Sequence, residues 1–338
     1  MKKSKGHGGK VSKGFKLTSV KKLLILCIVP EIKESYENIA LLFSLVKINH
    51  ISFKFVSDLK VTLIINGMQT AKSTFGCPYC YVKLRTPNTN EEPILRNYGD
   101  IRRHYEKFCL LDNIKKNAKY CFNVTNPPIF EEEDETEVLQ KCITPELHIL
   151  QGFVNHLFFN GLVPLLGKEN AYVWPKKLNI VSKNYQGELF EGNACRRLIK
   201  EAEKLYDKDI LKHISAIRLM PFVESFKAMD KIVTNCFSSK VQVNKYELKK
   251  YFVHLENVFK ATELSYTLKI HILLNHVLDT LLLLDNNDGL GLWSEQSIES
   301  VHREFLNYWS KYKINKLDNP RYGTHLVKCV IEFSSKHL

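Results

Sequence analysis

Hydrophobic and polar residues near the N-terminus form the pattern of a small α/β unit. The apolar runs Lys22–Val29 and Ile51–Ser57 are short, which is typical of strands, whereas Ser35–Val46 between them has helical spacing. We therefore predict a strand, a helix and a second strand, and the second strand ends at Asp58.

The rest of the chain has a mostly helical pattern. The most regular predicted helices between residues 77 and 265 are Glu146–Leu157, Asn193–Leu205 and Lys245–Lys260. Residues Ser265–Leu338 are again helical in pattern, with breaks at Asp285–Gly289 and at Asn319-Pro320. The pattern thus predicts an α/β piece that is separated from late helices by a long, mostly α-helical insertion.

The composition is that of a folded protein with more than one compact unit. Of the 338 residues, 44% are hydrophobic and 25% are charged, which excludes a disordered or fibrous chain. The longest apolar run, Leu23–Val29, is far too short to span a bilayer, so we expect no membrane as a partner. Nine cysteines without a regular framework indicate a reducing compartment, where paired cysteines bind metal or perform redox chemistry.

The net charge of +13 favours a polyanionic partner, and nucleic acid is the first candidate. Eight lysines and no acidic residue lie in residues 1–30, and glycines there disfavour a helix. We expect residues 1–22 to form a flexible basic arm that binds phosphates without reading bases. A solubilising tail is the alternative that composition leaves open.

Cys77-Pro78-Tyr79-Cys80 is a CxxC motif, which is the commonest half of a zinc site because two intervening residues bring both thiolates to one ion. His271 and His276 are candidates for the other half. A five-residue spacing places them on different faces of a straight helix, so the pairing requires a kink or a helix end. The alternative is that both are half-buried core histidines.

Redox chemistry is the competing interpretation of the CxxC motif. The string Cys-Pro-Tyr-Cys is the active-site string of glutaredoxins, in which the first thiolate lies at a helix N-terminus. Such a domain also needs a strand directly before the motif and a later cis-proline loop, and the sequence around residues 67–90 has neither pattern. Zinc binding is therefore favoured over a thiol oxidoreductase.

Two acidic residues are candidates for a second type of metal site. Asp58 closes the predicted second strand, and Glu299 opens a predicted helix that follows Trp293. Carboxylates at such positions can hold divalent cations that activate a nucleophile and a leaving oxygen. The alternative for Glu299 is favourable placement at a helix N-terminus.

The order and spacing of these residues resemble a known family. Asp58 precedes Cys77 by nineteen residues, with Lys60 two and Gly67 nine residues after it. Further matching stretches are Glu146–His148, Gly192–Leu198, the histidines five apart, Gly291, Trp293, Glu299 with Ser300, and Phe333–Leu338. From about residue 50 to its end, the chain thus resembles the catalytic subunit of the V(D)J recombinase and the related Transib transposases.

The resemblance implies a DDE-type transposase or recombinase. Its fold would be α/β, with an RNase H-like core (residues 23–76) incomplete at its N-terminus, a helical insertion with the zinc site (residues 77–276), and C-terminal helices that complete the core (residues 277–338). Asp58 and Glu299 would bind catalytic Mg²⁺ or Mn²⁺, and Cys77, Cys80, His271 and His276 would bind structural Zn²⁺. The partners implied are double-stranded DNA at transposon ends and a second copy of the chain, in the nucleus.

One departure from the family bears on activity. The family has an earlier catalytic Asp on the first strand, and this sequence contains no acidic residue before Glu31. We therefore expect the chain as it stands not to cut DNA, and we keep as the alternative a transposon-derived, non-catalytic DNA-binding zinc protein. In either case the residues expected to contact DNA phosphates are Arg196, Arg197, Lys10, Lys13 and Lys16.

Overall fold

The computed structural model describes residues 33–46, 52–83, 93–112, 114–183, 188–294, 296–312 and 318–337. The described residues fall into two compact units that divide after Gln296. The predicted strand Lys22–Val29, the basic arm and the candidate phosphate contacts Lys10, Lys13 and Lys16 lie outside the described residues.

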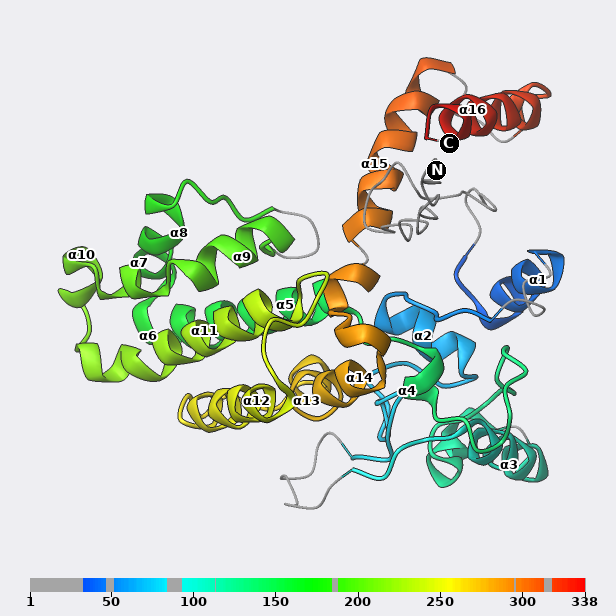
Figure 1. The fold of residues 1–338 in the computed structure, drawn as a ribbon, viewed down its shortest axis with the longest axis horizontal. Coiled ribbons are helices and arrows are strands. Elements are labelled where there is room, and N and C mark those ends of the chain that lie inside the picture. Colours follow the sequence, from blue (N-terminus) through cyan, green and yellow to red (C-terminus); the bar gives the residue numbers. More distant parts are fainter. Residues whose placement is uncertain are drawn as a thin grey trace, which may run out of the picture. The chain divides into compact units, whose positions relative to one another are not determined.

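The larger unit is built from helices joined by loops (Figure 1). Its α-helices are α1 (Tyr36–Val46), α2 (Leu59–Ile65), α3 (Tyr98–Leu110), α4 (Val138–Lys141), α5 (Glu146–Asn155), α6 (Val163–Leu166), α7 (Lys168–Ala171), α8 (Val173–Lys177), α9 (Gly192–Lys200), α10 (Lys208–Leu211), α11 (Ala216–Cys236), α12 (Lys245–Lys260), α13 (Leu268–Asn275) and α14 (Val277–Leu283). Short 3-10 helices are η3 (Lys115–Cys121), η5 (Ala202–Tyr206), η6 (Asp285–Asn287) and η7 (Leu290–Trp293), and η4 (His156–Leu162) is a π-helix.

The expected α/β fold with an RNase H-like core is wrong for this part of the chain. The described residues contain no strand and no sheet, only isolated β-bridges. Within the predicted strand Ile51–Ser57, Phe55 makes one parallel bridge to Cys142 through hydrogen bonds with Lys141 O and Ile143 N, both 2.8 Å long. With no neighbouring strand among the described residues, Phe53 and Phe55 pack instead against the ring of Phe130, at centroid distances of 5.4 and 5.3 Å.

The helical part of the prediction is confirmed. The predicted helix Ser35–Val46 is α1, and Lys245–Lys260 is α12 with the same bounds. Glu146–Leu157 corresponds to α5 and the start of η4, and Asn193–Leu205 to α9 and most of η5. These segments have an apolar stripe at helical spacing, which packing against a core stabilises irrespective of the surrounding fold.

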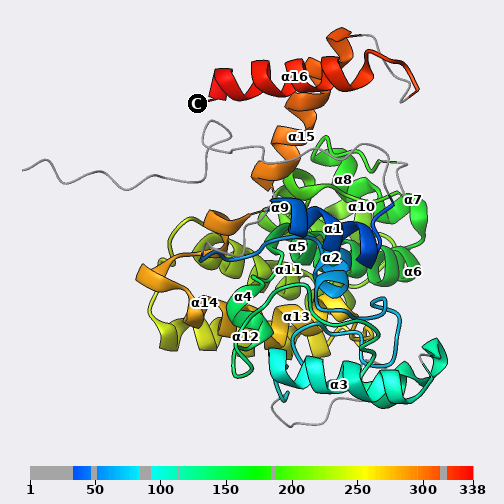
Figure 2. The ribbon, with the colours of Figure 1, turned by 90° about the vertical axis from the view of Figure 1, so that its right-hand side faces the viewer.

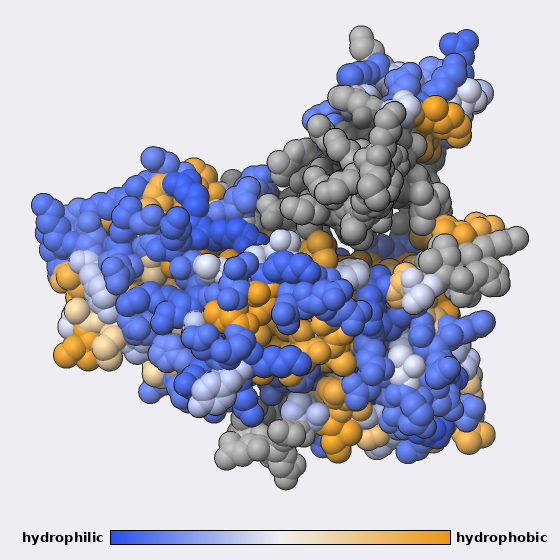
Figure 3. All heavy atoms as spheres, viewed as in Figure 1, coloured by the Kyte–Doolittle hydropathy of each residue, from blue (hydrophilic) through white to orange (hydrophobic). Residues whose placement is uncertain are grey.

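Helix α5 runs through the middle of the larger unit, with α9 on one side and α13 on the other, and α11 packs against α9 and α12 (Figure 1 and Figure 2). Trp174, Phe153, Phe226 and Phe259 are fully buried in this core. The face seen in Figure 3 is largely hydrophilic, with smaller apolar areas.

One continuous helical stretch of the described residues, Glu146–Leu166, is long and apolar enough to cross a membrane. It comprises α5, η4 and α6, and its buried side chains include Leu150, Phe153 and Phe158, with at most 1% exposure. Burial among α9, α11 and α13 accounts for this apolar composition, as is common for the core helix of a helical domain.

The smaller unit contains α15 (Gln296–Trp309) from its second residue onward, η8 (Ser310–Tyr312) and α16 (Tyr322–His337). Phe333 of α16 is almost fully buried, and its ring lies 5.7 Å from Phe305 and 5.6 Å from Tyr308. Helix α16 begins two residues after Asn319-Pro320, which agrees with the break predicted there.

Candidate metal centre

The first two candidate ligands, Cys77 and Cys80, lie in a turn of the loop of residues 69–83, which we call the zinc loop. The turn is held by an antiparallel bridge between Cys80 and Leu95 and by a 2.8 Å hydrogen bond from Arg96 N to Tyr79 O. Both cysteines are fully buried and free of disulfides. The zinc loop forms no helix after the motif, unlike the CxxC segment of a thiol oxidoreductase.

The second two candidate ligands, His271 and His276, come from the junction of α13 and α14. Thr267 caps α13 by accepting a hydrogen bond from Ile270 N, and His271 lies on the buried side of this helix. His276 has φ −126° and ψ −19°, which is not helical, and α14 begins at the next residue. The helix break turns the second ring toward the first, so the five-residue spacing is compatible with one site.

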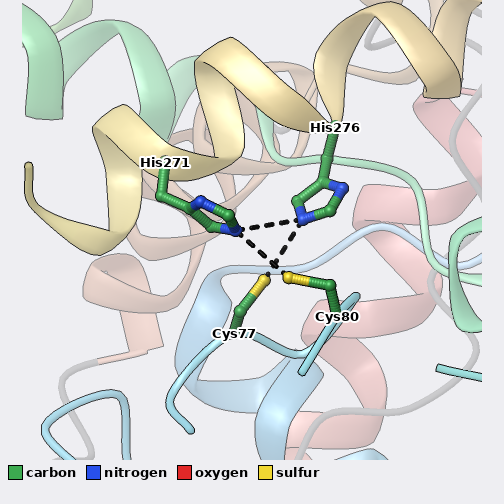
Figure 4. A group of neighbouring side chains, drawn as sticks. All are labelled: Cys77, Cys80, His271 and His276. Carbon is green, nitrogen blue, oxygen red and sulfur yellow. Dashed lines mark hydrogen bonds between the residues drawn. The ribbon is translucent and has the colours of Figure 1, made fainter. Parts of the chain in front are cut away.

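The four side chains point toward one centre (Figure 4). Their ligand atoms all lie within 4.8 Å of one another. Cys77 Sγ is 3.5 Å from His276 Nε2, Cys80 Sγ is 3.2 Å from His271 Nε2, and the two Nε2 atoms are 3.2 Å apart. The structure thus brings the four predicted ligands together as two cysteine–histidine pairs. Cys80 and His271 are 191 residues apart in the sequence, and Cys77 and His276 are 199 residues apart.

These distances fit tetrahedral zinc. With Zn–S bonds of about 2.3 Å and Zn–N bonds of about 2.0 Å, a tetrahedron separates two nitrogens by about 3.3 Å and a sulfur from a nitrogen by about 3.5 Å. The N–N separation of 3.2 Å and the Cys77–His276 separation of 3.5 Å match these values, and the Cys80–His271 separation of 3.2 Å is about 0.3 Å shorter. The remaining pairs of ligand atoms lie within 4.8 Å of one another. Two soft thiolates and two imidazoles form a closed set of ligands, which is typical of structural zinc sites because no position is left for water or substrate.

The electrostatics of the thiol pair favour one thiolate even without an ion. Burial raises the pKa of Cys77 well above its usual value. The hydrogen bond from the Cys77 thiol lowers the pKa of Cys80, and His271 and His276 lower it further. A bound cation would favour deprotonation of both sulfurs.

Arg96, which the sequence pattern did not indicate, stabilises the turn that contains Cys77 and Cys80. It is fully buried, and its Nε donates to Cys77 O at 3.1 Å and to Cys80 O at 2.9 Å. Its guanidinium carbon lies 4.4 Å from the centre of the Tyr81 ring. Burial lowers the pKa of Arg96, whereas Tyr81 and the sulfurs of Cys77 and Cys80 raise it. The arginine places a positive charge next to the pair of thiols, which stabilises thiolate.

Asn275 contacts the outer side of one histidine. Its amide nitrogen is 3.3 Å from His271 Nδ1 and donates to His271 O at 3.0 Å. An imidazole that binds metal through Nε2 carries its proton on Nδ1 and needs an acceptor there, so this contact with an amide nitrogen does not itself orient the His271 ring for metal binding.

The candidate catalytic acids Asp58 and Glu299 lie in different helical elements. Asp58 does not end a strand: it is the N-cap of α2, and its carboxylate accepts a 2.8 Å hydrogen bond from Val61 N. Glu299 lies in the first turn of α15, in the smaller unit. Their roles as ligands of Mg²⁺ or Mn²⁺ remain predictions.

The two arginines expected to contact DNA make contacts within the larger unit. Arg196 of α9 forms a salt bridge with Glu146, which is 1% exposed at its side chain and also accepts a 2.7 Å hydrogen bond from Ser294 Oγ. Arg197 donates from Nη2 to the carbonyl of Leu178. Both side chains stabilise the packing of α9, and their contact with phosphate remains a prediction.

Two glycines that contribute to the family resemblance have structural roles. Gly67 has φ +66°, and a Cβ there would lie 2.0 Å from Asn126 O. A Cβ on Gly291 would lie 2.3 Å from Phe237 O. Only glycine fits at these close approaches of two backbone segments.

No protein-family model matches this chain, and no curated protein matches it. The class of protein defined by fold and site is therefore a helical protein with a buried Cys₂His₂ cluster that could hold a metal ion such as zinc.

Proposed function

We propose that this chain is a DNA-binding protein of transposase descent whose larger unit is organised by one structural zinc ion. The observation that supports this proposal best is the buried Cys77, Cys80, His271 and His276 cluster, which reproduces the ligand set and order of the resemblance. The excess of 13 positive charges supports a polyanion as the partner. A nuclear location and a homodimer belong to the same proposal.

The role of the zinc ion in this proposal is structural. It joins the zinc loop to the α13–α14 junction, two segments about 190 residues apart. Because the four ligands meet only in the folded chain, the free energy of binding the ion stabilises the fold.

Metal-dependent strand cleavage is a second candidate function. It is supported by the spacing of Asp58 and Glu299 relative to the zinc ligands, as in the resemblance. Carboxylates that hold Mg²⁺ or Mn²⁺ would position a water or a 3′-hydroxyl for attack on a phosphodiester.

A thiol oxidoreductase has less support. The thiol of Cys77 is fully buried with a raised pKa, and a nucleophilic cysteine needs exposure and a lowered pKa.

The experiment that tests the proposed function combines metal analysis with DNA binding by the purified full chain. We expect about one zinc per molecule, and duplex binding with little sequence preference and a steep loss of affinity between about 50 and 200 mM salt. Deletion of residues 1–22 should flatten the plot of log affinity against log salt. A protein without zinc, or with DNA affinity independent of salt, would contradict the proposal.

A further inference from the structure

A pocket rich in lysine lies beside the metal centre in the larger unit. Its volume is about 290 Å³, and its walls are the zinc loop on one side and η3 with Asn123 on the other. Five of its nine lining residues are lysines, and its described lining contains no acidic residue. These residues, which we call the lysine pocket, are Lys72, Lys83, Lys115, Lys116 and Lys119. A concave surface with this charge attracts an anion.

Four of the lysines on the two walls are exposed to solvent. Lys72, Lys115, Lys116 and Lys119 are exposed and form no direct salt bridge with any carboxylate that the structure describes. Lys119 lies 4.9 Å from the centre of the Tyr120 ring, and Lys115 interacts at longer range with Glu37 of α1. The like charges repel one another, and a bound anion would relieve this repulsion.

Hydrogen bonds fix the two walls against each other. Gln69 donates from its backbone to Asn123 O at 2.9 Å and from its side chain to Lys115 O at 2.8 Å. With its amide oxygen toward the zinc loop, Asn123 accepts from the backbone N–H groups of Thr74 and Phe75, both at 3.2 Å. The pocket is therefore formed before any ligand arrives, which lowers the entropic cost of binding.

Arg96 connects the lysine pocket to the metal centre. Its Nη2 donates to Phe75 O at 3.3 Å and to Phe122 O at 3.2 Å, and these residues are adjacent in sequence to the lining residues Thr74 and Asn123. Its Nε donates to the carbonyls of Cys77 and Cys80. Because one buried side chain spans both sites, the conformation of the zinc loop determines the shape of the pocket.

We propose that the lysine pocket binds a phosphate group of the DNA backbone, which is an inference that rests on the proposed function. The cavity has the volume of about ten water molecules at roughly 30 Å³ each, enough for a phosphodiester and its neighbouring sugar atoms. Its described lining contains no aromatic side chain on which a base could stack. Contacts to phosphate alone position DNA without reading sequence.

The test compares two double variants of the full, zinc-loaded chain. Lys116→Ala with Lys119→Ala removes two charges from η3, and Lys245→Ala with Lys249→Ala removes two exposed charges from α12 as the matched control. The first variant should reduce the slope of log affinity against log salt by about 2, or about 1 per lysine. It should weaken binding to DNA duplexes of unrelated sequence equally. The control should keep the slope of the original chain. Lys72→Ala with Lys116→Ala, one lysine from each wall, repeats the test.

Competition with tripolyphosphate distinguishes the source of the phosphate. If the pocket holds backbone phosphate, tripolyphosphate displaces DNA from the original chain and displaces it less from the η3 variant. If both double variants bind DNA with the same slope of log affinity against log salt, the lysine pocket does not bind a DNA phosphate. The proposed function would not be affected by this result. If the chain binds tripolyphosphate through the η3 lysines but does not bind DNA, DNA is not the source of the phosphate and the proposed function is wrong. If the chain binds neither tripolyphosphate nor DNA, the phosphate site and the proposed function are both wrong.

Discussion

The Cys77, Cys80, His271 and His276 cluster and the segment around Asp58 lie in the same unit, but their side chains have opposite roles. The four cysteine and histidine side chains converge on a centre that no single helix or loop provides. The carboxylate of Asp58 instead binds the backbone of its own helix, at Val61 N. Donor atoms from distant segments that meet in a buried place indicate a metal site. The carboxylate of an N-cap residue already accepts a hydrogen bond from its own helix, so its presence alone does not indicate one.

The largest expected effect is the loss of a zinc ligand. Cys77→Ser or His276→Ala should abolish stoichiometric zinc and lower the free energy of unfolding by on the order of 5 kcal/mol, because metal binding is coupled to folding. Metal analysis and the Tm measure the two effects. Cys109→Ser, at an exposed cysteine of α3, is the control and should retain both zinc and Tm. A variant that loses zinc but keeps its Tm would show that the site does not hold the fold together.

A smaller effect is expected for the buried arginine below the zinc loop. Arg96→Met leaves the carbonyls of Cys77 and Cys80 without their donor, at a cost of about 3 kcal/mol in the free energy of unfolding. Arg96→Lys keeps the charge but lacks the planar fork that reaches both walls, so it should fail to restore stability.

The measurements for Arg96 are urea unfolding and competition for zinc with a chelator. Arg103→Lys is the control, since Arg103 forms an exposed pair with Asp100 and its replacement should change neither quantity. Equal stability of Arg96→Lys and the original chain would mean that charge alone supports the turn.

The smallest effect separates the two roles of Asp58. As an N-cap, Asp58→Asn should preserve the free energy of unfolding and Asp58→Ala should lower it by about 1 kcal/mol, because asparagine caps as well as aspartate. If Asp58 is instead a metal ligand, Asp58→Asn and Asp58→Ala should both abolish Mn²⁺-dependent strand nicking in a version extended upstream by an Asp-bearing strand, and so should Glu299→Ala. Nicking that survives in Asp58→Asn would restrict Asp58 to its role in α2.

The helices and the cysteine half of the candidate metal site were predictable from local signals, whereas the histidine half was supported by the family resemblance. The segment Lys245–Lys260 has an asparagine cap and an apolar stripe, and both appear in the sequence within one helix length. The CxxC motif is likewise local. Arg96 could not be found in this way, because its partners come from residues 75, 77, 80 and 122, and only the folded chain brings these carbonyls to one side chain.

The error in the predicted strand Ile51–Ser57 has a different origin. Short apolar runs rich in β-branched residues are compatible with a strand or a buried helix, and the outcome depends on available partners. Leu59–Ile65 forms a helix because Asp58 caps it and because Leu63 and Ile65 are buried in the core. The residues before it stay extended without a neighbouring strand among those described.

The sequence alone therefore determined the helical character of most of this protein, its basic charge, and the identity of four residues with the chemistry of zinc ligands. Tertiary structure decided that His276 would break its helix and face His271, that Arg196 would pair with the buried Glu146, and that five lysines would surround one pocket. The physical reason is distance along the chain. Helix propensity and ligand chemistry belong to neighbouring residues, whereas convergence of side chains depends on packing between segments up to 199 residues apart.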